Sequence, residues 1–257
     1  MEAMLVYSPR LTMADIEQWE KTEIVDAMHA KTAGYLARLA ETRAPIKAFV
    51  RGRPDGRFYG GLSFGKDSIV MCHLMREAAP NMHIVSIRNA ENFNPDSPRV
   101  EMALQSLLSH DYEVITYDYR NADSTYYDTE GHPVKWFNIL RDLKKRYGAH
   151  VTGIRADESA KRNRRVRVFG LETEYSFAPL AYMTVQDIFA YLHENGLPVH
   201  PVYAMTGGGR WDKYRLRVSA IGNPEGRGVG RLQWEREYYG DVLNRMGKTL
   251  WIREYDV

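Results

Sequence analysis

Apolar side chains near the start of the chain recur at near-helical spacing. They are Ile16, Trp19, Ile24, Ala27, Leu36 and Leu39. This period is that of an amphipathic helix, and Thr12 followed by Asp15 resembles a capping box at its start. The pattern predicts one long helix over residues 12–42, with Pro45 just beyond its end and a turn-rich loop at residues 51–57.

From residue 58 onward, short strand-like runs alternate with helical ones. The expected strands are residues 58–63, 82–88, 112–118 and 150–154. The expected helices between them are residues 67–78, 97–109 and 134–147. Because parallel neighbours need crossover connections, this alternation predicts an α/β fold with a doubly wound, mainly parallel sheet and helices on both faces. Ligands of such sheets bind beyond the carboxyl ends of the strands.

The pattern changes around Arg167. Two short pieces, residues 166–169 and 174–177, look like strands. Thr184 and Asp187 form a second capping box, which predicts a helix that runs to about residue 195. A last helix is expected over residues 232–246.

These patterns divide the chain into three parts. We predict an N-terminal helical segment at residues 1–50 and a nucleotide-binding domain at residues 51–205. A small C-terminal appendage follows at residues 206–257, and it consists of a Gly-rich and Arg-rich loop and a helix.

Composition excludes several protein classes. The 257 residues are 44% hydrophobic and 26% charged, as in ordinary globular proteins, which excludes disordered, collagen-like and disulfide-stapled chains. No apolar run approaches the roughly 20 residues of a membrane-spanning helix, and residues 1–11 do not resemble a signal peptide. We therefore expect a cytoplasmic protein with no membrane contact. The single cysteine, Cys72, argues against an internal disulfide, zinc or an iron-sulfur cluster.

The small net charge of +2 hides a basic segment. Residues 141–167 contain ten Lys or Arg side chains and three acidic ones. Such focusing suits an anionic partner, either a nucleotide or a nucleic acid, because a positive cleft concentrates anions. The alternative is a solvated helix face.

The most informative stretch is residues 58–68, Phe-Tyr-Gly-Gly-Leu-Ser-Phe-Gly-Lys-Asp-Ser. A strand, a short Gly-containing turn and a helix start bring backbone N–H groups and a helix dipole to one spot, where phosphate fits. Gly60, Gly65 and Lys66 approach a Walker A loop, but Asp67 stands where that loop needs a hydroxyl. We do not expect a Walker ATPase.

Three ordered stretches resemble a known family. Ser63-Phe-Gly-Lys-Asp-Ser68 is similar to the Ser-Gly-Gly-x-Asp-Ser loop of the ATP pyrophosphatase (PP-loop) superfamily, also called adenine nucleotide α-hydrolase-like. Its Ser-Phe-Gly form resembles the phosphoadenosine phosphosulfate (PAPS) reductase group. Residues 153–162, Gly-Ile-Arg-Ala-Asp-Glu-Ser-Ala-Lys-Arg, and the Pro-Leu to Val-Tyr stretch at residues 179–203 resemble two further segments of that group. The resemblance covers roughly residues 55–205.

The resemblance implies that the site binds ATP or a sulfonucleotide (PAPS or adenylyl sulfate). The residues that it implies for nucleotide binding are Ser63, Phe64, Gly65, Lys66, Asp67, Ser68, Arg88, Gly153, Glu158 and Ser159. Backbone groups of residues 87–89 would lie against adenine. The residues that it implies for catalysis are Lys66, Asp67, Arg155 and Arg162.

Each implied role has a physical reason. Lys66 would place a point charge on the phosphates, and the forked guanidinium groups of Arg155 and Arg162 match phosphate or sulfate oxygens. Asp67 would help to position Mg²⁺, or would only cap the helix. Glu158 would act directly, or would orient one of the two arginines through a salt bridge.

Cysteine usage separates two chemistries within the family. Sulfonucleotide reductases attack sulfur with a cysteine near the C-terminus, in a Glu-Cys-Gly-x-His setting, and no cysteine follows Cys72 here. A Lys-Asp-Ser loop is more similar to ATP-using members such as the small subunit of sulfate adenylyltransferase. We therefore expect ATP α/β-phosphate cleavage with adenylyl transfer.

Two alternatives stay open. One is a sulfonucleotide reductase-like protein that uses an external thiol, and the other is a nucleotide-binding regulator or subunit in nucleic-acid sulfur modification. The implied partners are an adenine nucleotide, a partner subunit or a second copy of the chain, and a nucleic acid.

Overall fold

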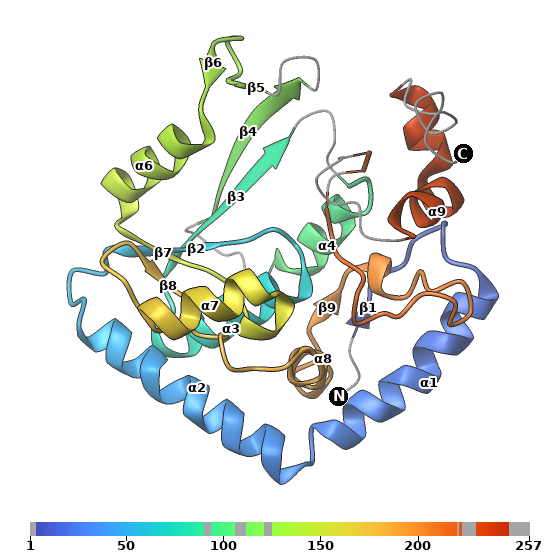
Figure 1. The fold of residues 1–257 in the computed structure, drawn as a ribbon, viewed down its shortest axis with the longest axis horizontal. Coiled ribbons are helices and arrows are strands. Elements are labelled where there is room, and N and C mark those ends of the chain that lie inside the picture. Colours follow the sequence, from blue (N-terminus) through green and yellow to red (C-terminus); the bar gives the residue numbers. More distant parts are fainter. Residues whose placement is uncertain are drawn as a thin grey trace.

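A seven-stranded sheet forms the centre of the structure, a computed structural model that describes residues 4–89, 94–105, 112–120, 125–219, 221–222 and 230–246 (Figure 1). Its strand order is β6-β5-β4-β3-β2-β7-β8. Five neighbouring strands are parallel: β4 (Tyr112–Arg120), β3 (His83–Asn89), β2 (Phe58–Gly61), β7 (Ala149–Val151) and β8 (Ser176–Phe177). At one edge the antiparallel strands β5 (Thr125–Tyr127) and β6 (Pro133–Val134) extend the sheet.

Helices cover both faces of this sheet. Along β2 and β3, Phe58 and Ile84 point into the main core, whereas Tyr59 and Val85 belong to a second cluster under α6 (Trp136–Tyr147). Successive side chains of a strand point to opposite faces, so α6 lies on the face opposite the main core. The helices α2 (Ala33–Arg51), α3 (Lys66–Ala78) and α8 (Val185–Glu194) contribute to the main core. The predicted α/β fold class is thus confirmed.

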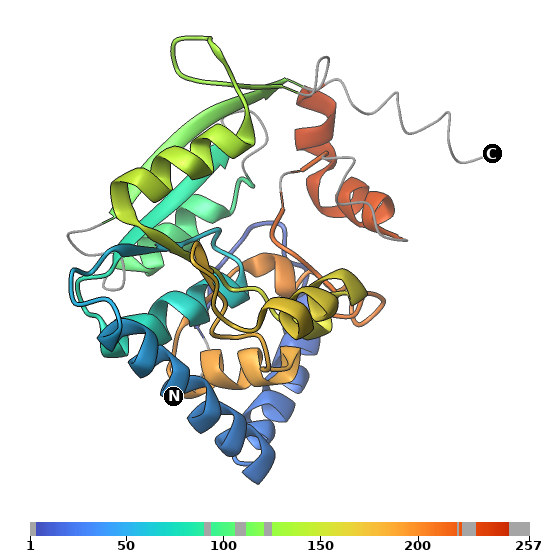
Figure 2. The ribbon, with the colours of Figure 1, turned by 60° about the vertical axis from the view of Figure 1, so that its left-hand side comes forward.

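The remaining elements frame the sheet (Figures 1 and 2). Helix α1 (Met13–His29) packs on α8, and the short strands β1 (Met4–Leu5) and β9 (Pro198–Val199) pair in a separate parallel ribbon. The others are α4 (Ser97–Ala103), the 3₁₀ turns η1 (Ala156–Glu158) and η2 (Pro201–Tyr203), α7 (Ala160–Phe169) and α9 (Arg231–Arg245). No helix in the described part of the chain is long and apolar enough to cross a membrane.

The predicted single helix at residues 12–42 is wrong, because α1 and α2 are separate. Thr32 begins the second helix, since its hydroxyl accepts a hydrogen bond from the Tyr35 N–H at 3.3 Å. Pro45 lies inside α2 rather than beyond it. The capping boxes at Thr12 and Thr184 are present as predicted.

The expected strand at residues 166–169 is also wrong. These residues end α7, which begins after Ser159, whose hydroxyl accepts a hydrogen bond from the Arg162 N–H. Val166 and Val168 suggested a strand, but Val166 is the one buried residue of the helix. Of the helix expected at residues 97–109, the structure has α4, and residues 106–109 lie outside the described part of the chain. The β5–β6 hairpin was not predicted.

Two carboxylates of α1 bind the chain's C-terminal part to it. Asp15 Oδ1 accepts hydrogen bonds from the Thr206 and Gly207 N–H groups, at 3.0 and 2.7 Å, and from the Tyr238 hydroxyl. Asp26 forms a buried ion pair with Lys213. Segment 206–219 is therefore fixed on α1, in a layer that the alternating sheet pattern does not include.

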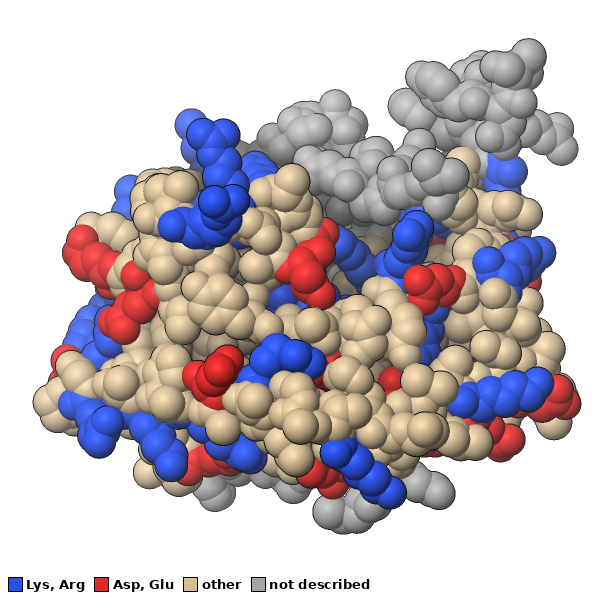
Figure 3. Space-filling model, turned by 60° about the horizontal axis from the view of Figure 1, so that its bottom comes forward, with Lys and Arg blue, Asp and Glu red and all other residues tan. Residues whose placement is uncertain are grey.

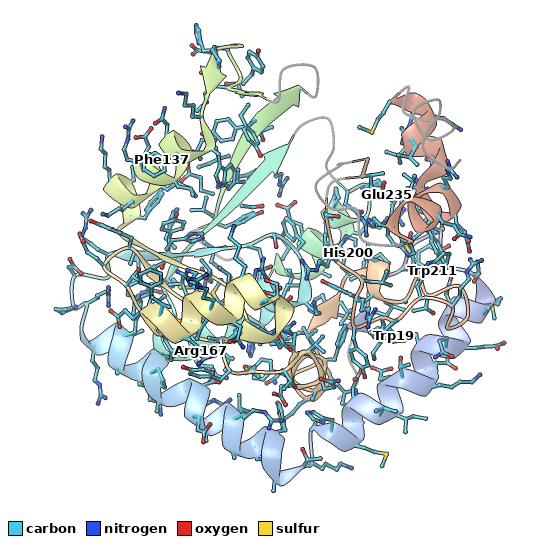
Figure 4. The ribbon with its side chains drawn as sticks, viewed as in Figure 1. Trp19, Phe137, Arg167, His200, Trp211 and Glu235 are labelled. Atoms are coloured by element: carbon cyan, nitrogen blue, oxygen red, sulfur yellow. The ribbon has the colours of Figure 1, made fainter. Side chains whose placement is uncertain are left out.

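Aromatic rings surround the Lys213 ammonium group. Its Nζ lies 4.9 Å from the ring centre of Trp19 and 4.7 Å from that of Phe189, within the range of cation–π attraction (Figure 4 labels Trp19). Burial lowers the pKa of Lys213 and raises that of Asp26, while each partner opposes the shift of the other. The pair is thus enclosed, and each partner supports the charge that burial disfavours on the other.

Breaking this pair from one side should destabilise the protein. Lys213→Met leaves Asp26 buried without its cation, which costs about 3–5 kcal/mol of unfolding free energy. Urea denaturation measures the loss. In the double variant Asp26→Leu, Lys213→Met most of the stability should return, because no charge stays buried. A loss below about 1 kcal/mol in the single variant would show that the pair is not a structural clamp.

His200 is a second buried polar group. Its Nδ1 accepts a hydrogen bond from the Val202 N–H, and its Nε2 lies 3.2 Å from the Ser97 hydroxyl (Figure 4). The ring is therefore neutral, with its proton on Nε2. Burial lowers its pKa to about 3.

This histidine should make stability depend on pH. Below the ordinary histidine pKa of about 6.5, His200 is protonated in the unfolded chain but stays neutral in the folded chain. The free energy of unfolding therefore falls as the pH falls from about 6.5 toward 3. Urea denaturation at pH 7 and at pH 4.5 gives the drop in unfolding free energy between these two pH values. This drop should be smaller for His200→Gln than for the wild type. The exposed His132→Gln should follow the wild type. Identical slopes for wild type and His200→Gln would contradict this assignment.

Candidate active site

The loop between β2 and α3 turns sharply at Phe64. Its φ of 59° makes it the one residue other than glycine with a positive φ in the described ranges, and its side chain is fully buried. A left-handed conformation costs a bulky residue about 1–2 kcal/mol, which burial of the ring offsets. Gly65 follows as the N-cap of α3 and offers no side chain to the first helical turn. Backbone N–H groups at this helix start therefore face a position that suits an anion.

Lys66, Asp67 and Arg155 form the charged centre of the site. Lys66 Nζ lies 2.9 Å from Asp67 Oδ2, and Arg155 Nη1 lies 3.2 Å from Asp67 Oδ1. The side chains of Lys66 and Arg155 are each 4% exposed. Asp67 Oδ1 and Arg155 Nη1 face each other in this ion pair, whereas Arg155 Nε is buried without a hydrogen-bond partner among the described residues. Buried polar atoms are almost always hydrogen-bonded, so the Nε donor of Arg155 is open to a ligand.

Glu158 connects the two predicted arginines. Its carboxylate accepts a hydrogen bond from the Arg155 N–H at 3.1 Å and forms an ion pair with the Arg162 guanidinium. Arg217 donates to the Glu158 carbonyl oxygen at 3.5 Å. Burial, together with repulsion from Arg217 and Arg155, lowers the pKa of Arg162. Three guanidinium groups thus crowd one wall of the site.

These residues line a cleft of about 1480 Å³. It lies at the carboxyl end of β2, as expected for a parallel sheet. The predicted residues that line it are Ser63, Gly65, Lys66, Asp67, Ser68, Gly153, Arg155, Glu158 and Arg162.

Three predicted residues do not line the cleft. Phe64 is packed beneath the loop, and Ser159 caps α7. Arg88 forms an ion pair with Glu101 and donates to the Tyr112 hydroxyl, while its neighbour Ile87 reaches the cleft.

Sequence reasoning missed a whole wall of the cleft. Segment 206–219 and the start of α9 supply its cationic side chains, which are Arg210, Arg215, Arg217 and Arg231. Tyr203 was also missed: its hydroxyl accepts a hydrogen bond from the Lys66 N–H at 3.1 Å, which binds the phosphate loop to this wall. The available signal was the arginine content of residues 206–230.

His150 also lines the cleft without having been predicted. It stacks on Tyr59, with ring centres 4.7 Å apart, and burial lowers its pKa to about 4. The cleft therefore holds a neutral imidazole at ordinary pH. No motif in the sequence marks this position.

Gly153 brings the two halves of the site together. A Cβ atom there would lie 2.8 Å from the Asp67 carbonyl carbon and 3.0 Å from the Ser68 nitrogen, so no side chain fits against the first turn of α3. The absence of a side chain lets the strand that leads to Arg155 touch the phosphate loop.

Gly153→Ala should therefore weaken nucleotide binding. The methyl group must push the start of α3 away from Arg155, and we expect at least a tenfold loss of affinity for ATP or PAPS by isothermal titration calorimetry. Gly240→Ala is the matched control, because nothing lies within 4 Å of its Cβ position. Equal affinity in the two variants would mean that the close approach does not shape the site.

Comparison with known proteins identifies the family. Residues 60–207, more than half of the chain, match the family model described as phosphoadenosine phosphosulfate reductase domain. The chain belongs to the PAPS reductase family. The family resemblance that the three motifs predicted is thus confirmed, and the matched range contains every predicted site residue from Ser63 to Arg162.

Curated relatives include PAPS reductases of Xanthomonas and Xylella. The reductase of Xanthomonas campestris pv. campestris (strain B100) is 27% identical over 158 residues, which is 55% of this chain and 64% of that protein. The reductase of Xylella fastidiosa (strain M23) is 25% identical over 158 residues, 55% of this chain and 65% of its own. The match to this PAPS reductase family member therefore spans less than two thirds of the length of these relatives.

Solved structures are more distant. Candida glabrata FMN adenylyltransferase in complex with ATP has a TM-score of 0.44 at 14% identity, over 74% of this chain and 66% of that one. The U34-tRNA thiolase NcsA of Methanococcus maripaludis, with its 4Fe-4S cluster, has a TM-score of 0.40 at 13% identity, over 86% and 81%.

Proposed function

We propose that the chain binds an adenine nucleotide in this cleft, cleaves ATP between its α- and β-phosphates and transfers the adenylyl group to an acceptor. The observation that carries the proposal is the buried Arg155 guanidinium, whose Nε lacks a hydrogen-bond partner in the described chain. It lies close to Lys66 at the start of α3, because Asp67 pairs with both cations. A phosphate group there would satisfy the Nε donor.

The residues present act by positioning and charge. In the proposed step an acceptor oxygen bonds to the α-phosphorus while the bond from that phosphorus to the bridging oxygen breaks, and pyrophosphate leaves with the electron pair. If the acceptor is a hydroxyl, its proton passes to water. Negative charge grows on the departing oxygens, where the fixed cations Lys66, Arg155 and Arg162 stabilise it.

Asp67 fits the role of a magnesium ligand. Its carboxylate lines the cleft at the start of α3 and is 17% exposed, and carboxylate oxygen is the donor that Mg²⁺ prefers. When bound, Mg²⁺ would neutralise phosphate charge. Asp67 also holds Lys66 and Arg155 in place, because its two oxygens face one cation each.

The position of Cys72 favours this chemistry over thiol-based reduction. The thiol is fully buried in α3 and does not line the cleft. Burial raises its pKa to about 12, so it is protonated and inert at neutral pH. Reduction of a sulfonucleotide would need a thiol from outside the described residues.

The test is release of labelled AMP and pyrophosphate from ATP with Mg²⁺, with and without sulfate or a nucleic acid. Arg155→Ala and Lys66→Ala should each lower the release rate at least 100-fold, the usual effect of removing a preorganised charged donor. Arg51→Ala, on the exposed side of α2, is the control and should match the wild type. No release by the wild type, together with tight binding of PAPS, would favour the reductase-like alternative instead.

A further inference from the structure

Helix α7 carries charge of one sign only. Its ten residues include five cations and no acidic side chain, and Val166 is its only buried residue. Lys161, Arg164 and Arg167 are exposed (Figure 4 labels Arg167). Within the described ranges, no acidic side chain forms an ion pair with any of these three. The helix thus presents uncompensated positive charge to solvent.

This charge pattern destabilises an isolated helix. Cations three or four positions apart repel each other, and Lys161 lies in the first turn, where the helix dipole disfavours positive charge. The helix is nevertheless held in place, because Arg162 pairs with Glu158 and Arg165 donates to the Ser176 hydroxyl at 2.8 Å. A bound polyanion would remove the repulsion.

The positive surface continues into the cleft. Arg162 of α7 lines the cleft, and Arg217 reaches the Glu158 carbonyl oxygen beside it. Arg215, whose side chain is 89% exposed, stands on the same wall. Figure 3 shows Lys and Arg side chains interspersed with Asp and Glu on the face that it draws. Arg162, Arg215 and Arg217 thus line the cleft together, and Arg162 joins it to α7.

Exposed aromatic rings accompany the cations. Phe169 ends α7 at 62% exposure. Tyr175 precedes the Ser176 that Arg165 contacts, and Lys144 Nζ lies over one face of its ring, 3.0 Å from the ring centre. Tyr182 is 61% exposed and follows Ala181, whose carbonyl oxygen accepts a hydrogen bond from the Ala156 N–H of η1. Trp136 lines the cleft and is 42% exposed. Flat rings beside a basic groove are the usual means of binding single-stranded nucleic acid.

We propose that α7 and the arginines at the edge of the cleft bind the phosphate backbone of a single-stranded nucleic acid. Lys161, Arg164 and Arg167 follow one another at intervals of three residues, which suits a polymer with one negative charge per nucleotide. The exposed aromatic rings would give the bases of that strand surfaces on which to stack. The proposal stands apart from the proposed function, since strand binding requires no cleavage of ATP.

The experiment measures binding without nucleotide. Fluorescence anisotropy measures the binding of labelled single-stranded 20-nucleotide DNA and RNA to the wild type and to one triple variant. That variant is Lys161→Gln, Arg164→Gln, Arg167→Gln. The matched control is Lys31→Gln, Lys47→Gln, Arg51→Gln, which removes three exposed cations from the α1–α2 turn and from α2. Glutamine keeps helix propensity close to that of lysine and arginine, and circular dichroism checks the fold of both variants.

We expect the α7 variant to bind at least tenfold more weakly, and the control less than twofold. The slope of log K against log salt should fall in magnitude by about 2 in the α7 variant, because each lost phosphate contact to a single strand accounts for about 0.7. Equal losses in the two variants, no strand binding at 50 mM salt, or equally tight binding of polyglutamate would overturn the proposal. Pyrophosphate release is a separate assay, so failure of the proposed function is recognised independently.

Discussion

The contact between Gly153 and the first turn of α3 is the constraint on which the site depends. Two crossover connections of the sheet begin there, one that leads from β2 into the phosphate loop and one that leads from β7 toward Arg155. Only because no side chain intervenes can Asp67 meet Arg155 and Lys66 at once. Opposite charges then lie at contact distance in a buried place, and Arg155 Nε keeps an unused hydrogen-bond donor. A site built in this way is ordered before any ligand arrives.

Local signals in the sequence were enough for the parallel strands β2, β3, β4 and β7 and for the phosphate loop. The alternating strand and helix patterns between residues 58 and 154 follow from short-range periodicity, and the fold agrees with them except at the β5–β6 hairpin. Capping residues were equally reliable at Thr12 and Thr184. The prediction failed at residues 166–169, where the local sequence is compatible with either a strand or a helix. Val166 and Val168 favour a strand by propensity, but the Ser159 cap and a single buried contact make a helix.

The missed wall of the cleft has a different cause. Arg210, Arg215 and Arg217 reach the site because segment 206–219 is attached to α1 through Asp15 and Asp26. These contacts join residues about 190 positions apart. Neither periodicity nor a motif can predict that one carboxylate pairs with one lysine so far along the chain. His150 escaped notice for a similar reason, since its place beside Gly61 follows from strand register alone.

The attachment of segment 206–219 to α1 also bears on the order in which the protein folds. The phosphate loop and the Arg155 turn come from neighbouring strands, so they can form as soon as β2, β3 and β7 pair. The arginine wall needs α1 to pair with Lys213, which lies 187 positions after Asp26, before the buried Asp26 carboxylate has its cation. Contacts of such long sequence separation form late because the loop entropy must be overcome first. During folding, the phosphate loop and the Arg155 turn should thus come together before segment 206–219 completes the cleft.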